Sequence, residues 1–213
     1  MEKSPKAEEI LSKLISENTR LGDVRKLAKE INKDHPLALE LWATGNFFAR
    51  QLAILILDPK SVSETDLDHL FDDIDAHQGT ERLQLIDWLM ANQLVRSKRL
   101  LTLISQWANS RSPLKRRVYW YHQARLRWTG KIQPDSEMLL NDLGAKIEGE
   151  VPEVQWAMNF TAAWIGVFEK DLRQRCIRLG EKTGLFQGQK VPKGCTPDYL
   201  PEFIRIESQK RNL

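Results

Sequence analysis

Apolar residues recur at the spacing of an α-helix along nearly the whole chain. The first two stripes consist of Ile10, Leu11, Leu14 and Ile15, followed by Val24, Leu27, Ala28 and Ile31. Residues 53–57 are rich in isoleucine and by themselves suit a buried strand. Their flanks, residues 46–51 and Asp58-Pro59, favour instead a helix of about 12 residues that ends at the proline. Since no Asn-Gly or Asp-Gly turn separates alternating runs, the pattern predicts an all-α fold.

The breaks between these helices divide the middle of the chain into similar units. They lie at residues 34–36, 45, 58–59, 79, 110–113, 130–134 and 149–152. Long apolar helices are predicted to begin near Asn46, Glu81, Leu114 and Glu153, roughly 33 to 39 residues apart, each followed by a second helix. This period is typical of HEAT-like helical repeats, which must stack to bury their apolar faces. We therefore expect one domain over 1–213, an α-solenoid with a concave surface, closed by a proline-containing tail and a short helix in 184–213.

The composition indicates a globular protein and argues against several classes of site. The chain has 213 residues, of which 41% are hydrophobic and 29% charged, a balance typical of a globular domain. Its two cysteines and four scattered histidines suggest neither a disulfide framework nor a metal site, and no glycine-rich phosphate loop is present. No cofactor or metal is therefore expected. Because no apolar run approaches roughly 20 residues, we expect no membrane span. The N-terminus does not resemble a signal peptide, so we expect a cytoplasmic protein. We also expect a monomer.

Charge is segregated along the chain. Between Asp87 and Asp135 there is no acidic residue. The cations of this basic window are Arg96, Lys98, Arg99, Arg111, Lys115, Arg116, Arg117, Arg125, Arg127 and Lys131. Helix surfaces usually interleave both signs, so such a run favours an external polyanion such as a nucleic-acid backbone. The predicted binding residues are those at two helix-to-helix turns: Arg96, Lys98 and Arg99, then Lys115, Arg116 and Arg117.

The alternative is internal neutralisation. The preceding helix carries six carboxylates, Glu64, Asp66, Asp68, Asp72, Asp73 and Asp75, which offer counter-charges.

Aromatic residues also occur among the cations of the basic window, and most tryptophans at helical spacing belong to the core. Trp120 and Tyr121 follow Arg116 and Arg117 by about one turn, so they are the candidates for stacking on a base.

Several segments resemble the AlkD-like DNA alkylation-repair family. They are LGDVRKLAKE at 21–30, DHPLALELW at 34–42, residues 49–50 and 58–59, Asp87 followed by Asn92, Arg116-Arg117, Met158-Asn159, and KVPKGCTP at 190–197. The resemblance covers nearly the whole chain in order. It implies a HEAT-like solenoid with a basic concave groove for duplex or branched DNA. The activity it implies is that of a DNA glycosylase that releases N3- and N7-alkylated purines, cationic leaving groups, without flipping the lesion into a pocket.

The resemblance also implies roles for particular residues. The catalytic carboxylate, which would stabilise the developing oxocarbenium ion, falls on Asp87, and an arginine that contacts the DNA backbone falls on Arg117. A tryptophan expected one turn before the carboxylate falls on Leu83, which has no π face. A second expected tryptophan falls near Phe160, with Trp156 and Trp164 close by, and an arginine one turn later falls near Ala163.

Three functions therefore stay open. The chain is a glycosylase for alkylated purines that uses Asp87, a non-catalytic binder of DNA structures, or a HEAT-like scaffold for protein partners. Asp87 itself has two interpretations. It lies in an apolar helix, where it is either a catalytic or DNA-facing carboxylate, or a structural acid paired with an arginine such as Arg117.

Overall fold

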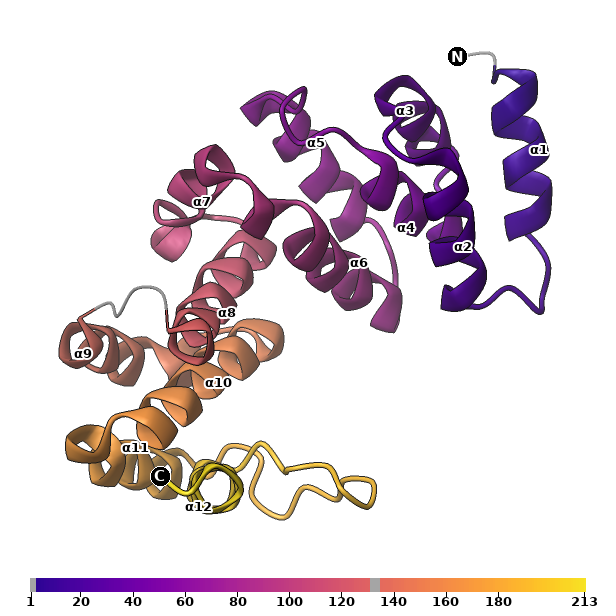
Figure 1. Cartoon of the computed structure of the whole chain (residues 1–213). Coiled ribbons are helices and arrows are strands. Elements are labelled where there is room, and N and C mark those ends of the chain that lie inside the picture. The colour runs from indigo at the N-terminus through magenta and orange to yellow at the C-terminus, as the bar shows by residue number, and fades with distance from the viewer. Residues whose placement is uncertain (1–2, 131–134) are drawn as a thin grey trace. The chain divides into compact units, whose positions relative to one another are not determined.

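The computed structural model describes residues 3–130 and 135–213, and within these ranges every regular element is a helix (Figure 1). The α-helices are α1 (Pro5–Leu14), α2 (Leu21–Ile31), α3 (His35–Ala43), α4 (Phe47–Ile56), α5 (Glu64–Asp75), α6 (Gly79–Asn92), α7 (Lys98–Ile104), α8 (Pro113–Thr129), α9 (Ser136–Lys146), α10 (Pro152–Phe168), α11 (Lys170–Thr183) and α12 (Leu200–Arg211). Three short 3-10 helices, η1 (Leu94–Arg96), η2 (Trp107–Asn109) and η3 (Ile147–Gly149), stand between them. The all-α prediction is confirmed. Lys131 and the predicted break at 131–134 lie outside the described residues.

The four long helices begin within two residues of their predicted starts, and local chemistry explains why. The Asn46 side chain accepts a hydrogen bond from the Ala49 amide at the start of α4, and Ser112 accepts one from Lys115 at the start of α8. Such caps satisfy amides that have no partner inside the helix. α8 and α10 also begin with a proline, which lacks the amide that would otherwise need a partner.

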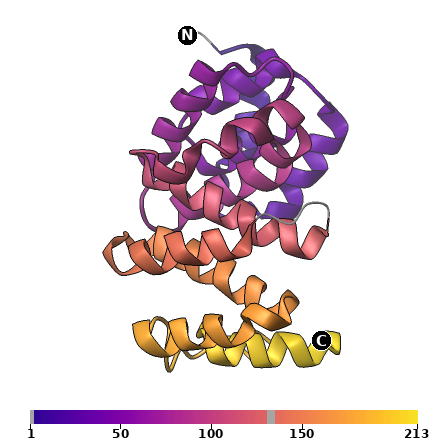
Figure 2. The ribbon, with the colours of Figure 1, turned by 90° about the vertical axis from the view of Figure 1, so that its left-hand side faces the viewer.

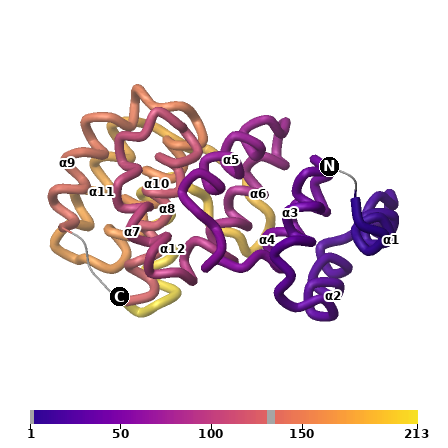
Figure 3. Tube along the Cα trace, turned by 90° about the horizontal axis from the view of Figure 1, so that it is seen from above, coloured from indigo at the N-terminus to yellow at the C-terminus, as the bar shows by residue number. Residues whose placement is uncertain are grey.

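The chain folds into two compact units, residues 1–103 and 104–213. In the first unit α4 is the central helix, because it contacts α2, α3 and α6 (Figure 3). Its buried residues lie all round it: Ala49, Arg50, Gln51, Leu52, Ala53, Ile54 and Ile56. A helix that is buried on every side needs apolar residues beyond a single stripe, which explains the isoleucine-rich segment that resembled a strand.

In the second unit α10 is the central helix, and it packs against α8, α11 and α12. Its residues 161–167 are all buried. The closing helix α12, yellow in Figure 2, lies beside α11. Two glycines allow this close packing, because a Cβ on Gly180 would lie 2.6 Å from Leu200 Cβ, and one on Gly166 would lie 2.5 Å from Ile204 Cδ1.

Residues 185–198 form the predicted irregular tail between α11 and α12. Gly184 ends α11 with a left-handed backbone (φ 61°), a conformation that glycine adopts without strain. The tail is attached to α10, because Asn159 donates a hydrogen bond to the Asp198 carbonyl at 2.7 Å. No helix among the described residues is long and apolar enough to cross a membrane.

Candidate functional site

A pocket of about 780 Å³ opens in the first unit between α2, the end of α4 and the end of α6. Its lining residues are Arg25, Ala28, Lys29, Asn32, Lys33, Leu55, Trp88, Ala91, Asn92 and Arg96. Four of them are cations and, among the residues that the structure describes, none is acidic. We call this the α2–α6 pocket.

The four cations of the pocket come from two places in the sequence. Arg25 and Lys29 are four residues apart in α2, so they share one side of that helix, and Lys33 follows just beyond its end. Arg96 ends η1, the short helix that follows α6. None of the four forms an ion pair with a carboxylate in the described part of the chain.

Lys33 is an exposed lining residue whose side chain is held against the end of α4. Its Nζ donates to the carbonyls of Leu55, at 3.0 Å, and Leu57, at 2.5 Å, where α4 ends. Carbonyls at a helix C-terminus attract a cation, since they carry the negative end of the helix dipole. Desolvation, and then the positive charge of Arg96, lower the pKa of Lys33, whereas Asp58 acts in the opposite direction. An anion in the pocket would remove the repulsion between these two cations.

Trp88 supplies the aromatic wall. Its Nε1 donates to the Gln51 carbonyl at 3.0 Å, and the Asn92 amide donates to the Trp88 carbonyl at 2.9 Å. The Arg25 guanidinium lies over the indole, 5.2 Å from the ring centroid. The indole is thus fixed in orientation and already in contact with a cation.

Of the site residues predicted in the first unit, some line this pocket or lie next to its lining and others do not. Arg96 lines it, and Asp87 directly precedes Trp88 on α6, where the side chain is half-buried. Leu83 lies one turn before Asp87 on the same helix and is also half-buried. Lys98 and Arg99 are exposed and are not among the lining residues, and Arg99 donates a hydrogen bond to the Val62 carbonyl.

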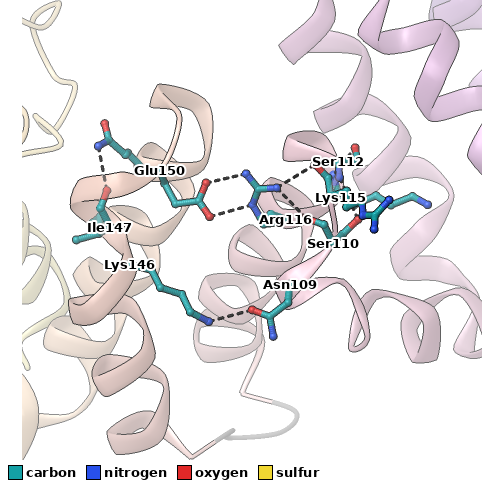
Figure 4. A network of polar contacts seen from close by, with 10 residues as sticks. Asn109, Ser110, Ser112, Lys115, Arg116, Lys146, Ile147 and Glu150 are labelled. Carbon is teal, nitrogen blue, oxygen red and sulfur yellow. Dashed lines mark hydrogen bonds and ion pairs between the residues drawn. The ribbon is translucent and has the colours of Figure 1, made fainter.

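In the second unit, the expectation that the basic cations lack internal partners is wrong for Arg116. Its Nε and Nη2 contact the two carboxylate oxygens of Glu150 at 2.9 and 2.8 Å, and its Nη1 donates to the Ser110 carbonyl at 2.7 Å (Figure 4). Glu150 directly follows η3 and lies two residues before the start of α10, 34 residues away from Arg116 in sequence. Folding brings this counter-charge to the start of α8, although no acidic residue lies near Arg116 in the sequence.

Arg127 and Arg117 are also engaged inside the second unit. Arg127 is buried, and it pairs with Glu169 at 3.3 Å and donates to the Ser136 hydroxyl at 2.6 Å. Arg117 is 4% exposed. It donates to the Glu153 carbonyl at 3.1 Å, and its guanidinium lies 4.4 Å from the Trp156 ring centroid. Lys115, at half exposure, lies with its Nζ 5.5 Å from the Trp107 ring centroid.

Trp120, predicted to contact DNA, is a core residue, and this prediction is wrong. Only 1% of it is exposed, and it lies on the side of α8 that faces α10, where Thr161 donates a hydrogen bond to its carbonyl at 2.6 Å. Tyr121 is half-buried and stacks on Trp156 and Phe160, with centroid distances of 5.9 and 5.7 Å. Both rings therefore serve mainly to pack α8 against α10.

The acidic helix α5 pairs with arginines outside the basic window. Asp73 lies 3.5 Å from Arg50 and Asp75 lies 2.6 Å from Arg82. Asp66 instead closes the start of α5, where it accepts hydrogen bonds from Ser63. These three carboxylates thus have local structural roles.

Three pocket cations, Arg25, Lys29 and Lys33, were not identified from the sequence as binding residues. A signal was available for Arg25 and Lys29, because their spacing of four places them on one helical face, whereas Lys33 lies beyond the end of α2. It is weak because Asp23 and Glu30 occur in the same segment, so the charge is not segregated in sequence. Among the described residues, no group of three or more His, Cys, Asp or Glu side chains is placed to hold a metal ion.

Comparison with solved structures shows the fold. The chain is similar to a protein described as belonging to a new family related to the HEAT-like repeat DNA glycosylases, with affinity for branched DNA structures. The TM-score is 0.65 at 21% identity, over 99% of this chain and 89% of that one. The HEAT-like fold expected from the helix spacing is confirmed.

Sequence comparison shows the family. An uncharacterised protein of Listeria innocua is 21% identical over 195 residues, which cover 91% of this chain and 82% of the relative. The family model described as DNA alkylation repair enzyme matches residues 17–172, a span that contains the α2–α6 pocket, Asp87 and the start of α8. The chain therefore belongs to the DNA alkylation repair enzyme family.

Proposed function

We propose that this protein binds DNA and that the α2–α6 pocket is a principal contact with the phosphate backbone. The observation that carries the proposal is the set of four cations, Arg25, Lys29, Lys33 and Arg96, around a pocket with no acidic residue in its described lining. Membership of the DNA alkylation repair family and the affinity of the similar solved protein for branched DNA support the same conclusion.

The electrostatics of the pocket favour this ligand. Lys33 and Arg96 are close enough for the charge of one to lower the pKa of the other. A phosphate group between such cations replaces their repulsion with attraction, and the counterions released from DNA add to the binding free energy. Affinity should therefore fall steeply with salt, because each phosphate contact contributes about 0.9 to the slope of log K against log salt concentration.

The test is a fluorescence-anisotropy titration of labelled blunt duplex and three-way-junction DNA at several salt concentrations. The variant Lys29→Gln with Arg96→Gln removes two exposed pocket charges. It should weaken binding at least tenfold and reduce the salt slope by about 2. The matched control is Lys26→Gln with Lys60→Gln, which removes two exposed charges of the same unit that do not line the pocket, and it should change the affinity less than twofold.

Two results would contradict the proposal. Absence of DNA binding by the native protein at low salt would reject it and favour the protein-scaffold function. Equal weakening by the pocket variant and by the control that also removes two charges would mean that net charge, and not this pocket, determines the affinity.

Base excision is the second candidate function, and one observation supports it. Asp87 and Trp88 are consecutive residues of α6, so the helix that carries the family's expected carboxylate also carries the aromatic wall of the pocket. Leu83, however, occupies the place one turn earlier where the resemblance implies a tryptophan. Since an aliphatic side chain cannot stabilise a cationic base through a π face, we infer DNA binding with at most slow base release.

A further inference from the structure

The α2–α6 pocket has more than a phosphate contact requires. A flat basic surface is sufficient for backbone binding, but this site also has an aromatic wall at Trp88 and an apolar part formed by Ala28, Leu55 and Ala91. Its volume of about 780 Å³ is comparable with the roughly 300–1,000 Å³ of small-molecule sites, but the pocket is open to solvent, so a ligand would lie across it without being enclosed.

We propose that this pocket accepts one unpaired nucleotide of a DNA strand. The base would contact Trp88 and Arg25, and the adjoining phosphates would bind Lys33, Lys29 and Arg96. This inference rests on the proposed DNA binding and names the feature of DNA that the pocket recognises. Overhangs, flaps and junctions with unmatched bases supply such nucleotides, whereas a perfect blunt duplex exposes them only by fraying.

The arrangement of aromatic and cationic groups fits a base with its phosphates. Indole rings and guanidinium planes are the protein surfaces on which unstacked bases pack. In this pocket the two lie together, since the Arg25 guanidinium is 5.2 Å from the Trp88 centroid. The hydrogen bond from Trp88 to the Gln51 carbonyl holds the indole in place before a ligand arrives, which lowers the entropic cost of binding.

A paired nucleotide fits the site less well. Inside a duplex both faces of a base are covered by its neighbours, so the indole could reach only the edge of the stack. An unpaired nucleotide exposes a face and brings its negative charge with it. The pocket offers a place for each: Trp88 with Arg25 and the apolar residues for the base, and Lys29, Lys33 and Arg96 for the phosphates.

The experiment compares three probes with native protein and two variants. The probes are a labelled blunt duplex, the same duplex with a short single-stranded overhang, and free deoxyadenosine monophosphate as a competitor. Trp88→Leu removes the π face while keeping apolar bulk, and Trp88→Phe keeps a π face. Circular dichroism and thermal unfolding of each variant verify the fold, because Trp88 is half-buried and hydrogen-bonded.

We expect the native protein to prefer the overhang duplex by about tenfold. Trp88→Leu should abolish the preference for the overhang duplex, and Trp88→Phe should retain most of that preference. If Trp88→Leu does not fold, Arg25→Gln, an exposed change on the same wall, must reduce the preference.

The contrary results are distinct from those of the DNA-binding test. Salt-sensitive binding of both duplexes with no preference for the overhang overturns the nucleotide pocket and leaves the proposed function standing. A preference that persists in folded Trp88→Leu and in Arg25→Gln overturns it as well. Competition by the free mononucleotide at concentrations equal to those of the overhang duplex would identify a free-nucleotide site in place of a DNA-strand site.

Discussion

Arg116 and Glu150 form a two-point ion pair that joins the start of α8 to the residue after η3 (Figure 4). Both side chains are mostly buried, with 17% and 15% exposed. A guanidinium that meets both carboxylate oxygens forms one of the stronger polar contacts in proteins, and removing one partner leaves the other charge poorly solvated.

We therefore predict a coupling energy of about 1–2 kcal/mol between these residues in a double-mutant cycle with Arg116→Gln and Glu150→Gln, measured by urea unfolding. The control is the pair Lys182 and Glu148 in the same unit, which is 3.3 Å apart but 65% and 59% exposed. Its coupling should stay within about 0.5 kcal/mol. In addition, Arg116→Gln should weaken DNA binding less than Arg96→Gln does, and the reverse order would refute our assignment of Arg116 to structure.

Asp87 provides the test of chemistry. We expect the native protein to release 7-methylguanine from alkylated duplex DNA slowly or not at all, because Leu83 presents no π face to the cationic base. Any release should disappear in Asp87→Asn, which keeps the shape of the side chain but not its charge. Chromatography of the released base gives the measurement. Release at equal rates by both forms would show that Asp87 is not the catalytic carboxylate.

His122 predicts a dependence of stability on pH. It is 8% exposed, its Nδ1 has no hydrogen-bond partner among the described residues, and burial, followed by the charge of Arg125, lowers its pKa from 6.5 to about 4. Between pH 6.5 and 4, His122 therefore binds a proton in the unfolded chain but stays neutral in the folded chain. The free energy of unfolding should fall as the pH is lowered through this window, by up to about 3 kcal/mol.

Urea unfolding at pH 7 and pH 4.5 measures this loss, and His122→Gln serves as the comparison. The variant should lose clearly less stability than the native protein between the two pH values, because its side chain does not titrate. An equal loss in both proteins would assign the effect to other groups. The pKa of Glu207 lies at about 2, because hydrogen bonds from Lys210, Thr196 and Arg211 together outweigh the effect of its burial. The stability that Glu207 contributes is therefore lost mainly below pH 4.5, outside this comparison.

Gly180 tests the packing of the closing helix. A Cβ at this position would lie 2.6 Å from Leu200 Cβ and 2.8 Å from Pro201 Cδ. Gly180→Ala should thus destabilise the protein by about 2 kcal/mol, because α12 must move away from α11. Gly144→Ala in α9 is the control, since no atom lies within 4 Å of its Cβ, and it should be neutral or stabilising by up to about 1 kcal/mol. Equal thermal midpoints for the two variants would contradict this close packing.

The two cysteines should differ sharply in reactivity. Cys176 is buried, and burial raises the pKa of its thiol to about 12, whereas Cys195 is exposed in the tail. A colorimetric thiol reagent at neutral pH should therefore label one thiol per native chain quickly and the second only in denaturant. Cys195→Ser should remove the fast phase, and a fast phase that survives in this variant would place Cys176 at the surface.

The helices themselves could be predicted from the sequence, because a helix depends on local spacing and local caps. The segment at 53–57 illustrates this: its flanks identified a helix where its composition suited a strand, and α4 spans Phe47–Ile56. The helix starts depend on nearby residues: Asn46, Ser112 and the prolines at 113 and 152. Because each acts on the next few residues, its effect can be predicted from the linear sequence.

The site was predicted only in part, because two residues that form an ion pair can lie far apart in the sequence. The absence of acidic residues from 88 to 134 suggested that Arg116 had no counter-charge, yet Glu150 approaches it from 34 positions away. Helical spacing likewise indicated that Trp120 shares a region with Arg116, but not that its side faces α10 and is buried.

The all-helical class, the approximate helix starts, the resemblance to DNA alkylation-repair proteins and the existence of a basic region all follow from the linear sequence. Which cations keep their charge available depends on how the helices pack. Packing placed Glu150 against Arg116, and it brought Arg25 and Lys33 of the α2 region together with Trp88 and Arg96 around a pocket without an acidic residue in its described lining. The physical reason is that Coulomb interactions and burial depend on distance in space, which the chain sets only when its helices pack.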